Sequence, residues 1–285
     1  MAIGVFDSGV GGLTVHRTLV ERFPQADFVY LADQANAPYG GRAGEEIVAL
    51  TKAGALRLFE EGCDLVVLAC NTASAIALRR LQQTWLPAYR AETGRKVNVL
   101  GLIVPTIEAA TGLPWEYEAP AHDDDGRLEM HDVIGVFCTV ATADSRVYEI
   151  EIAKRREDIA VFSEACSGLA GMIEDGASRD ELKAVIAGHA AILTARIGKA
   201  PDRAILGCTH YEIVADLFAE ALPPGTPLIG QPDAVADALE RYFQRHPEYA
   251  AGSGGTRRFL TTGRAGKQSG LVETFWGAPV TFEGV

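Results

Sequence analysis

The chain has 285 residues, 48% hydrophobic and 22% charged, which is enough to bury one large core or two smaller ones. Its formal net charge of -12 disfavours nucleic acid or an anionic membrane as a partner. No apolar run approaches the roughly 20 residues that cross a bilayer, and no signal-like segment opens the chain, which predicts a cytoplasmic location. Five cysteines without a C-x-x-C pair are typical of free thiols in a reducing compartment and disfavour a structural metal site.

Apolar, strand-like runs alternate with helical stretches along most of the chain. The pattern predicts strands at 2–6, 26–33, 63–70, 96–103, 132–137, 158–166, 202–208 and 257–263, and helices at 11–23, 43–62, 72–86 and 178–198. The strands are apolar on both faces, as in parallel sheets that are covered by helices. We therefore predict an α/β fold.

The sequence also contains an internal repeat. "IGVFDS" at 3–8 returns as "IGVFCT" at 134–139, and two strands that end in Cys70 and Cys208 hold matching places further along. Such a repeat predicts two pseudo-symmetric, duplicated parallel-sheet α/β domains with the active site in the cleft between them. We expect residues 1–98 plus 211–285 to form the first lobe and residues 99–210 to form the second.

One segment departs from the alternating pattern. Residues 111–132 are rich in proline, aspartate and histidine, which predicts a solvated surface loop between two strands. A lid over the cleft, or a metal site built from His122, Asp123 and Asp125, is the alternative.

Two cysteines occupy the same kind of corner in the two repeats. Cys70 and Cys208 each follow a strand and precede a helix, at the sheet edge where α/β proteins bind ligands. Backbone N–H groups and the helix dipole at such a corner favour an anion and lower a thiol pKa. A single buried cysteine usually packs as a small hydrophobic residue, which is the role we assign to Cys63, Cys138 and Cys166. Because Cys70 and Cys208 share one structural context, a chemical role at the sheet edge is favoured for both over simple packing.

Thiols on opposite walls of a cleft predict an acid and a base on either side of one carbon atom. One thiol removes a proton from one face while the other donates to the opposite face, which inverts a stereocentre without a cofactor or a metal. Asp7 is the candidate partner for Cys70, and His210 is the candidate partner for Cys208. Two alternatives stay open, Asp7 as the cap of the following helix and His210 as a polar helix start.

Five motifs give the chain a family resemblance: "GVFDSGVGGLTV", "PYG", "ACNTASA", "GVFCTVATADS" and "LGCTHYEIV". In order and spacing they resemble the glutamate racemases of the aspartate/glutamate racemase superfamily, over nearly the whole chain. The resemblance implies cofactor-independent, two-base racemisation of a dicarboxylic amino acid in a homodimer. It also implies a role in supplying D-glutamate for peptidoglycan.

The resemblance assigns roles to individual residues. Cys70 and Cys208 would be the acid/base pair, assisted by Asp7, His210 and Glu174, although Glu174 also fits a solvated carboxylate at a helix end. Residues that would bind the substrate are Ser8, Pro38, Tyr39, Gly40, Asn71, Thr72, Thr139, Thr142 and Thr209. Of these, the Tyr39–Gly40 backbone with Thr139 and Thr142 would receive the side-chain carboxylate, and Ser8, Asn71, Thr72 and Thr209 would hold the amino and α-carboxylate groups.

Other functions stay open beside this one. The segment "ADQANA" before "PYG", Pro105–Thr106 and Cys166–Ser167 depart from the family pattern, which leaves aspartate or another acidic compound as an alternative substrate. A non-catalytic amino-acid-binding relative is a further alternative. Nucleotide binding is disfavoured because "GVGGLT" is not G-x-G-x-x-G and Asp7 would repel phosphate. Since the chain begins at its first strand, we expect no activation by a peptidoglycan precursor.

Overall fold

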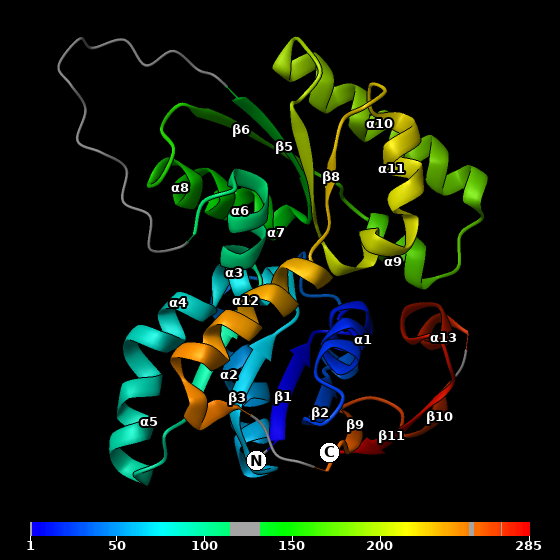
Figure 1. Cartoon of the computed structure of the whole chain (residues 1–285). Coiled ribbons are helices and arrows are strands. Elements are labelled where there is room, and N and C mark those ends of the chain that lie inside the picture. Colours follow the sequence, from blue (N-terminus) through cyan, green and yellow to red (C-terminus); the bar gives the residue numbers. More distant parts are fainter. Residues whose placement is uncertain (1, 115–131, 251–253, 269) are drawn as a thin grey trace, which may run out of the picture.

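A computed structural model describes residues 2–114, 132–250, 254–268 and 270–285. The proposed loop ligands His122, Asp123 and Asp125 lie outside the described residues. Strands form two sheets, one of seven strands in the order β10-β11-β9-β2-β1-β3-β4 and one of four in the order β6-β5-β7-β8. Each sheet forms the centre of one lobe, and the two lobes are stacked in Figure 1.

The first sheet and its helices come from both ends of the chain. Its N-terminal elements are β1 (Ala2–Asp7), α1 (Leu13–Arg22), β2 (Asp27–Ala32), α2 (Gly44–Glu60), β3 (Cys63–Leu68), α3 (Asn71–Ile76), α4 (Leu78–Arg80), a π-helical turn (Leu81–Trp85), α5 (Leu86–Thr93) and β4 (Asn98–Gly101). Its C-terminal elements are α12 (Pro232–Arg245), β9 (Arg257–Thr261), β10 (Gly266–Gln268), α13 (Leu271–Trp276) and β11 (Val280–Gly284).

The second sheet comes from the middle of the chain. Its elements are α6 (Ile103–Thr111), β5 (Asp132–Cys138), α7 (Val140–Ser145), α8 (Val147–Ala153), β6 (Ile159–Ala165), α9 (Leu169–Glu174), α10 (Arg179–Ile197), β7 (Arg203–Gly207), α11 (Ala215–Ala221) and β8 (Leu228–Ile229). Short 3-10 turns complete the chain at Gln34–Asn36, Thr209–Val214 and Pro247–Tyr249.

The two sheets repeat one topology. Strand β1 lies between β2 and β3 with β4 beyond, and strand β5 lies between β6 and β7 with β8 beyond. All of these neighbours are parallel, and the central strands β1 and β5 are buried over nearly their whole length. The predicted fold class, two duplicated parallel-sheet α/β domains, is confirmed. Equivalent strands therefore present their carboxyl ends, and the residues that follow them, at equivalent corners.

The expected lobe boundaries differ from the sheets. Strand β4 pairs with β3 as far as Gly101, so the first sheet extends past residue 98. Strand β8 pairs with β7, so the second sheet extends past residue 210 to Ile229. A two-residue edge strand leaves no periodic pattern, which is why the sequence did not indicate it. We propose lobes of residues 2–101 plus 232–285 and of residues 103–229.

The predicted helix at 72–86 does not keep one hydrogen-bonding pattern over its length. It divides into α3, α4, the π-helical turn and α5, and it runs on to Thr93, where Gly94 adopts the left-handed conformation that ends many helices. None of the helices in the described ranges is both long and apolar enough to cross a bilayer.

Candidate active site

One small cavity of about 40 Å³ lies between the carboxyl ends of the two sheets, and both predicted cysteines line it. The predicted site residues on its wall are Ser8, Pro38, Tyr39, Gly40, Cys70, Asn71, Thr72, Thr139, Glu174, Cys208, Thr209 and His210, with Ala37 and Ala170 in addition. The other two predicted residues are hydrogen-bonded behind that wall, Asp7 to the turn before α1 and Thr142 to Thr139. Residues from both lobes thus meet at one place.

Cys70 is positioned by the end of β3 and the start of α3. Its Sγ atom accepts a hydrogen bond from the backbone N of Ala73 at 3.5 Å and lies 3.3 Å from Ser8 Oγ. Burial raises the pKa of the Cys70 thiol to about 12, the charge of Asp7 adds to the rise, and the hydrogen bonds offset part of it. At neutral pH this sulfur therefore holds its proton and is a proton donor.

Cys208 has a different partner. His210 Nδ1 lies 3.7 Å from Cys208 Sγ, and His210 Nε2 lies 2.7 Å from Glu174 Oε1. Burial lowers the pKa of His210, but the hydrogen bonds to Cys208 and Glu174 outweigh it and raise that pKa to about 10. The ring is then an imidazolium that donates from both nitrogens, so the Cys208 sulfur accepts. The two corners are equivalent in fold but differ in the hydrogen-bond partners of their sulfur atoms.

Asp7 ends β1 and is almost completely buried. Its Oδ2 atom accepts from the backbone N–H groups of Gly9 at 3.2 Å and Gly12 at 2.9 Å. Burial raises the pKa of this carboxyl, and the nearby His210 lowers it in part. These two hydrogen bonds hold the turn before α1, and the charge of Asp7 also acts on Cys70.

The glycine-rich turn is needed because the backbone passes close to the site. A Cβ atom at Gly11 would lie 2.6 Å from the His210 ring and from Thr209 Oγ1, and a Cβ at Gly12 would lie 2.7 Å from Asp7 Cβ. Real carbon atoms do not approach this closely, so only glycine fits without displacing His210.

We expect Gly11→Ala to lower kcat/KM of the racemisation that the sequence predicts by roughly 10²-fold or more, because His210 is expected to assist Cys208 and a displacement of about 1 Å at such a group costs that much. Gly188→Ala is the matched control, since its added Cβ would meet nothing within 4 Å in the exposed middle of α10. Steady-state kinetics of both variants, with circular dichroism to confirm folding, test the expectation. Normal kcat/KM in Gly11→Ala would contradict the close approach.

Hydrogen bonds across the cavity hold the lobes together. Thr72 Oγ1 lies 3.0 Å from Thr139 Oγ1, and the backbone N of Ala141 donates to the carbonyl of Gly40 at 3.1 Å. Since each buried water needs roughly 10–15 Å³, the cavity of about 40 Å³ has room for only a few waters. The cavity as described is therefore too small to hold an amino acid.

Sequence reasoning missed several residues that shape this site. Asp33 accepts from Tyr39 OH at 2.6 Å and from Thr262 Oγ1 at 2.7 Å, which fixes the segment that carries Tyr39 and Gly40. Gln231 binds the side chain of Asn71. The only sequence signal for Asp33 was its position shortly before "PYG". Gln231 is a buried glutamine before a helix, and such a position leaves no recognisable pattern in the sequence.

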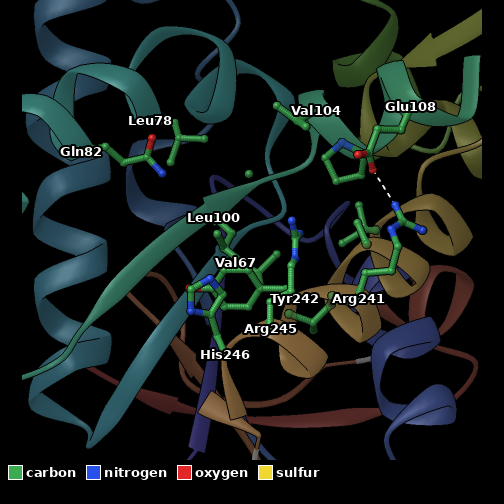
Figure 2. A pocket seen from close by; sticks show the side chains of 15 residues that line it. Val67, Leu78, Gln82, Leu100, Val104, Glu108, Arg241, Tyr242, Arg245 and His246 are labelled. Carbon is green, nitrogen blue, oxygen red and sulfur yellow. Dashed lines mark hydrogen bonds and ion pairs between the residues drawn. The ribbon is translucent and has the colours of Figure 1, made fainter. Parts of the chain in front are cut away.

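A larger cavity of about 340 Å³ lies elsewhere, where α12 meets α6, β4 and the π-helical turn (Figure 2). Aliphatic side chains such as Val67, Leu100 and Val104 line it, and the ion pair of Arg241 with Glu108, 2.5 Å long, lies on its rim. It contains neither of the two cysteines. Size alone therefore does not identify the reacting site. Among the described residues, no cluster of three or more His, Cys, Asp or Glu side chains is placed to bind a metal ion.

The fold and the cavity define a two-lobed α/β enzyme with one thiol from each lobe at a shared site. The model of the Asp/Glu/hydantoin racemase family matches residues 13–239. The glutamate racemase of Phenylobacterium zucineum is 75% identical and that of Caulobacter sp. 70% identical, each over 99% of both chains. The crystal structure of glutamate racemase from Francisella tularensis in complex with D-glutamate has a TM-score of 0.79 at 26% identity, covering 100% of this chain and 97% of that one.

The chain belongs to the Asp/Glu/hydantoin racemase family. The resemblance inferred from the five motifs is confirmed, and so is the enzyme class that it implied, an isomerase that racemises an amino acid.

Proposed function

We propose that this enzyme interconverts L-glutamate and D-glutamate by a two-thiol acid/base mechanism that needs no cofactor. The observation that carries the proposal is the single cavity lined by Cys70 and Cys208, one from each lobe. Curated relatives at 75% and 70% identity are glutamate racemases, and the Francisella tularensis structure holds D-glutamate, which supports glutamate as the substrate.

In one direction the Cys208 sulfur, beside the His210 imidazolium, removes the α-proton of the substrate. Cys70, which holds its proton, then delivers it to the opposite face of the same carbon, and the stereocentre is inverted. The reverse reaction exchanges the two roles. Glu174 holds the His210 ring, and the charge of Asp7 acts on Cys70.

Neutral donors around the cavity bind the substrate in this proposal. Thr139 and Thr142, with the backbone of Tyr39 and Gly40 beside Pro38, receive the side-chain carboxylate. The α-carboxylate and amino groups are held by Ser8, Asn71, Thr72 and Thr209. We further propose that the enzyme works as a homodimer in the cytoplasm and supplies D-glutamate for peptidoglycan.

Hydrogen exchange tests substrate and chemistry together. In D₂O we expect deuterium at the α-carbon of glutamate and, by chiral chromatography, a racemic mixture from either enantiomer. Aspartate lacks one methylene and should react roughly 10–200-fold more slowly in kcat/KM. The protein is first dialysed against a chelator, and no pyridoxal is added. Faster turnover of aspartate would identify the alternative substrate, and no exchange with either amino acid would refute the racemase assignment.

A further inference from the structure

Gln231 connects the two corners that carry Cys70 and Cys208. It lies directly before α12, where the chain returns to the first lobe, and it is 0% exposed. Its backbone N–H donates to Glu212 Oε1 at 2.8 Å, in the turn that follows Cys208. Its side chain binds Asn71, the residue after Cys70. One buried residue thus holds a neighbour of each thiol.

The side chains of Gln231 and Asn71 form a reciprocal amide pair. Asn71 Nδ2 donates to Gln231 Oε1 at 2.6 Å, and Gln231 Nε2 donates to Asn71 Oδ1 at 2.8 Å. Such a pair by itself tolerates a simultaneous flip of both amides. Thr106 removes the ambiguity. Its hydroxyl donates to the carbonyl of Leu102 at 2.6 Å, so its oxygen accepts from Gln231 Nε2 at 3.1 Å.

This orientation leaves the Asn71 side chain with one N–H group that is available to a ligand. Its Oδ1 atom accepts from Gln231 and from Tyr148 OH, the latter at 3.1 Å, which uses both lone pairs. Its Nδ2 atom has two hydrogens, and one of them goes to Gln231. Asn71 lines the cavity beside Cys70, so what it offers a ligand there is an N–H donor and no acceptor.

We propose that Gln231 is a positioning residue that holds Asn71 with a single N–H available to the substrate, so that Asn71 binds a carboxylate oxygen and not the ammonium group. This inference rests on the proposed function. An ammonium group needs acceptors, which Asn71 no longer has, whereas a carboxylate accepts several hydrogen bonds. Gln231 itself touches no substrate and acts through Asn71.

Gln231→Met keeps the length of the side chain and removes its hydrogen bonds. We expect KM for both enantiomers to rise about tenfold because a contact with the bound carboxylate is weakened, and kcat to fall as well, because negative charge from the deprotonated α-carbon spreads onto the α-carboxylate that Asn71 holds. Glutarate, a dicarboxylate without an ammonium group, should lose inhibition by the same factor. Gln268→Met is the matched control, because it breaks another reciprocal amide pair, with Gln34 at 3.3 Å, and should leave both constants unchanged.

Gln231→Glu is a second, isosteric variant that retains an oxygen for Asn71 Nδ2 but adds negative charge, so its KM should rise further. If thermal unfolding shows that Gln231→Met is not folded, KM and glutarate inhibition of Gln231→Glu are used to test the inference. An unchanged KM in the folded Gln231 variants overturns the inference. So does a higher KM for glutamate without weaker glutarate inhibition, since Asn71 would then bind the ammonium group. Failure of the wild type to racemise glutamate refutes the proposed function instead.

Discussion

We expect Cys70→Ser and Cys208→Ser each to lower kcat for racemisation by on the order of 10²–10⁴-fold in both directions. This is the usual contribution of a positioned acid or base. An alcohol is a far weaker acid than a thiol, so it neither donates nor is regenerated as a base. Binding should persist, because the neutral donors around the cavity are unchanged. Racemisation followed by chiral chromatography, with calorimetric binding of glutamate, measures both quantities.

The two variants should also differ from each other. Each keeps one thiol, which exchanges the α-proton of the enantiomer whose hydrogen faces it. In D₂O, Cys70→Ser and Cys208→Ser should therefore exchange opposite enantiomers. Cys63→Ala is the control, because Cys63 is a buried cysteine at the start of β3, the other end of the strand that leads to Cys70. Exchange of the same enantiomer by both variants would rule out one base on each face.

The site was predictable from the sequence because the chain repeats itself. Residues that follow equivalent strands fall at equivalent corners, so two cysteines in matching motifs were expected to meet, and both line one cavity. The repeat also shows where the halves have diverged. Asp7 ends β1 where Cys138 ends β5, and burial raises the pKa of both groups. Asp7 lies beside the site, whereas Cys138 is a packed core thiol, as predicted.

The supporting residues could not be found in the same way. Asp33, Tyr148 and Gln231 act through side-chain contacts with residues that are far apart in the chain, such as Thr262 for Asp33, and no local periodicity encodes such pairs. The expected lobe boundaries differ from the sheets for a related reason. Strand β8 has two residues and takes its place from pairing with β7, so it gives no signal of its own. The repeat predicted that matching corners meet, whereas contacts outside the repeat left no signal in the sequence.

His16 contributes a pH dependence of stability that lies outside the reaction. It is 0% exposed, and neither ring nitrogen has a hydrogen-bond partner among the described residues. Its ring packs against Phe28, Tyr30, Phe259 and Trp276, with ring centroids 5.0–5.6 Å apart. Burial, with a smaller effect of Arg257, lowers the pKa of His16 from 6.5 to about 3. Between pH 6.5 and about 3, His16 is therefore protonated in the unfolded chain and neutral in the folded chain.

The sign follows from that difference in bound protons. Above pH 6.5, His16 is neutral in both the folded and the unfolded chain and does not reduce the free energy of unfolding. As the pH falls from 6.5 toward 3, protonation of His16 in the unfolded chain lowers the free energy of unfolding, by about 3 kcal/mol at pH 4.5. We expect urea unfolding of His16→Phe to lose about that much less stability than the wild type between pH 7.5 and 4.5. Phe28→Leu, a packing change beside the same ring, should lower stability equally at both pH values. Parallel pH curves for the wild type and His16→Phe would show that His16 takes its proton in the folded protein, and the aromatic enclosure would then not exclude charge.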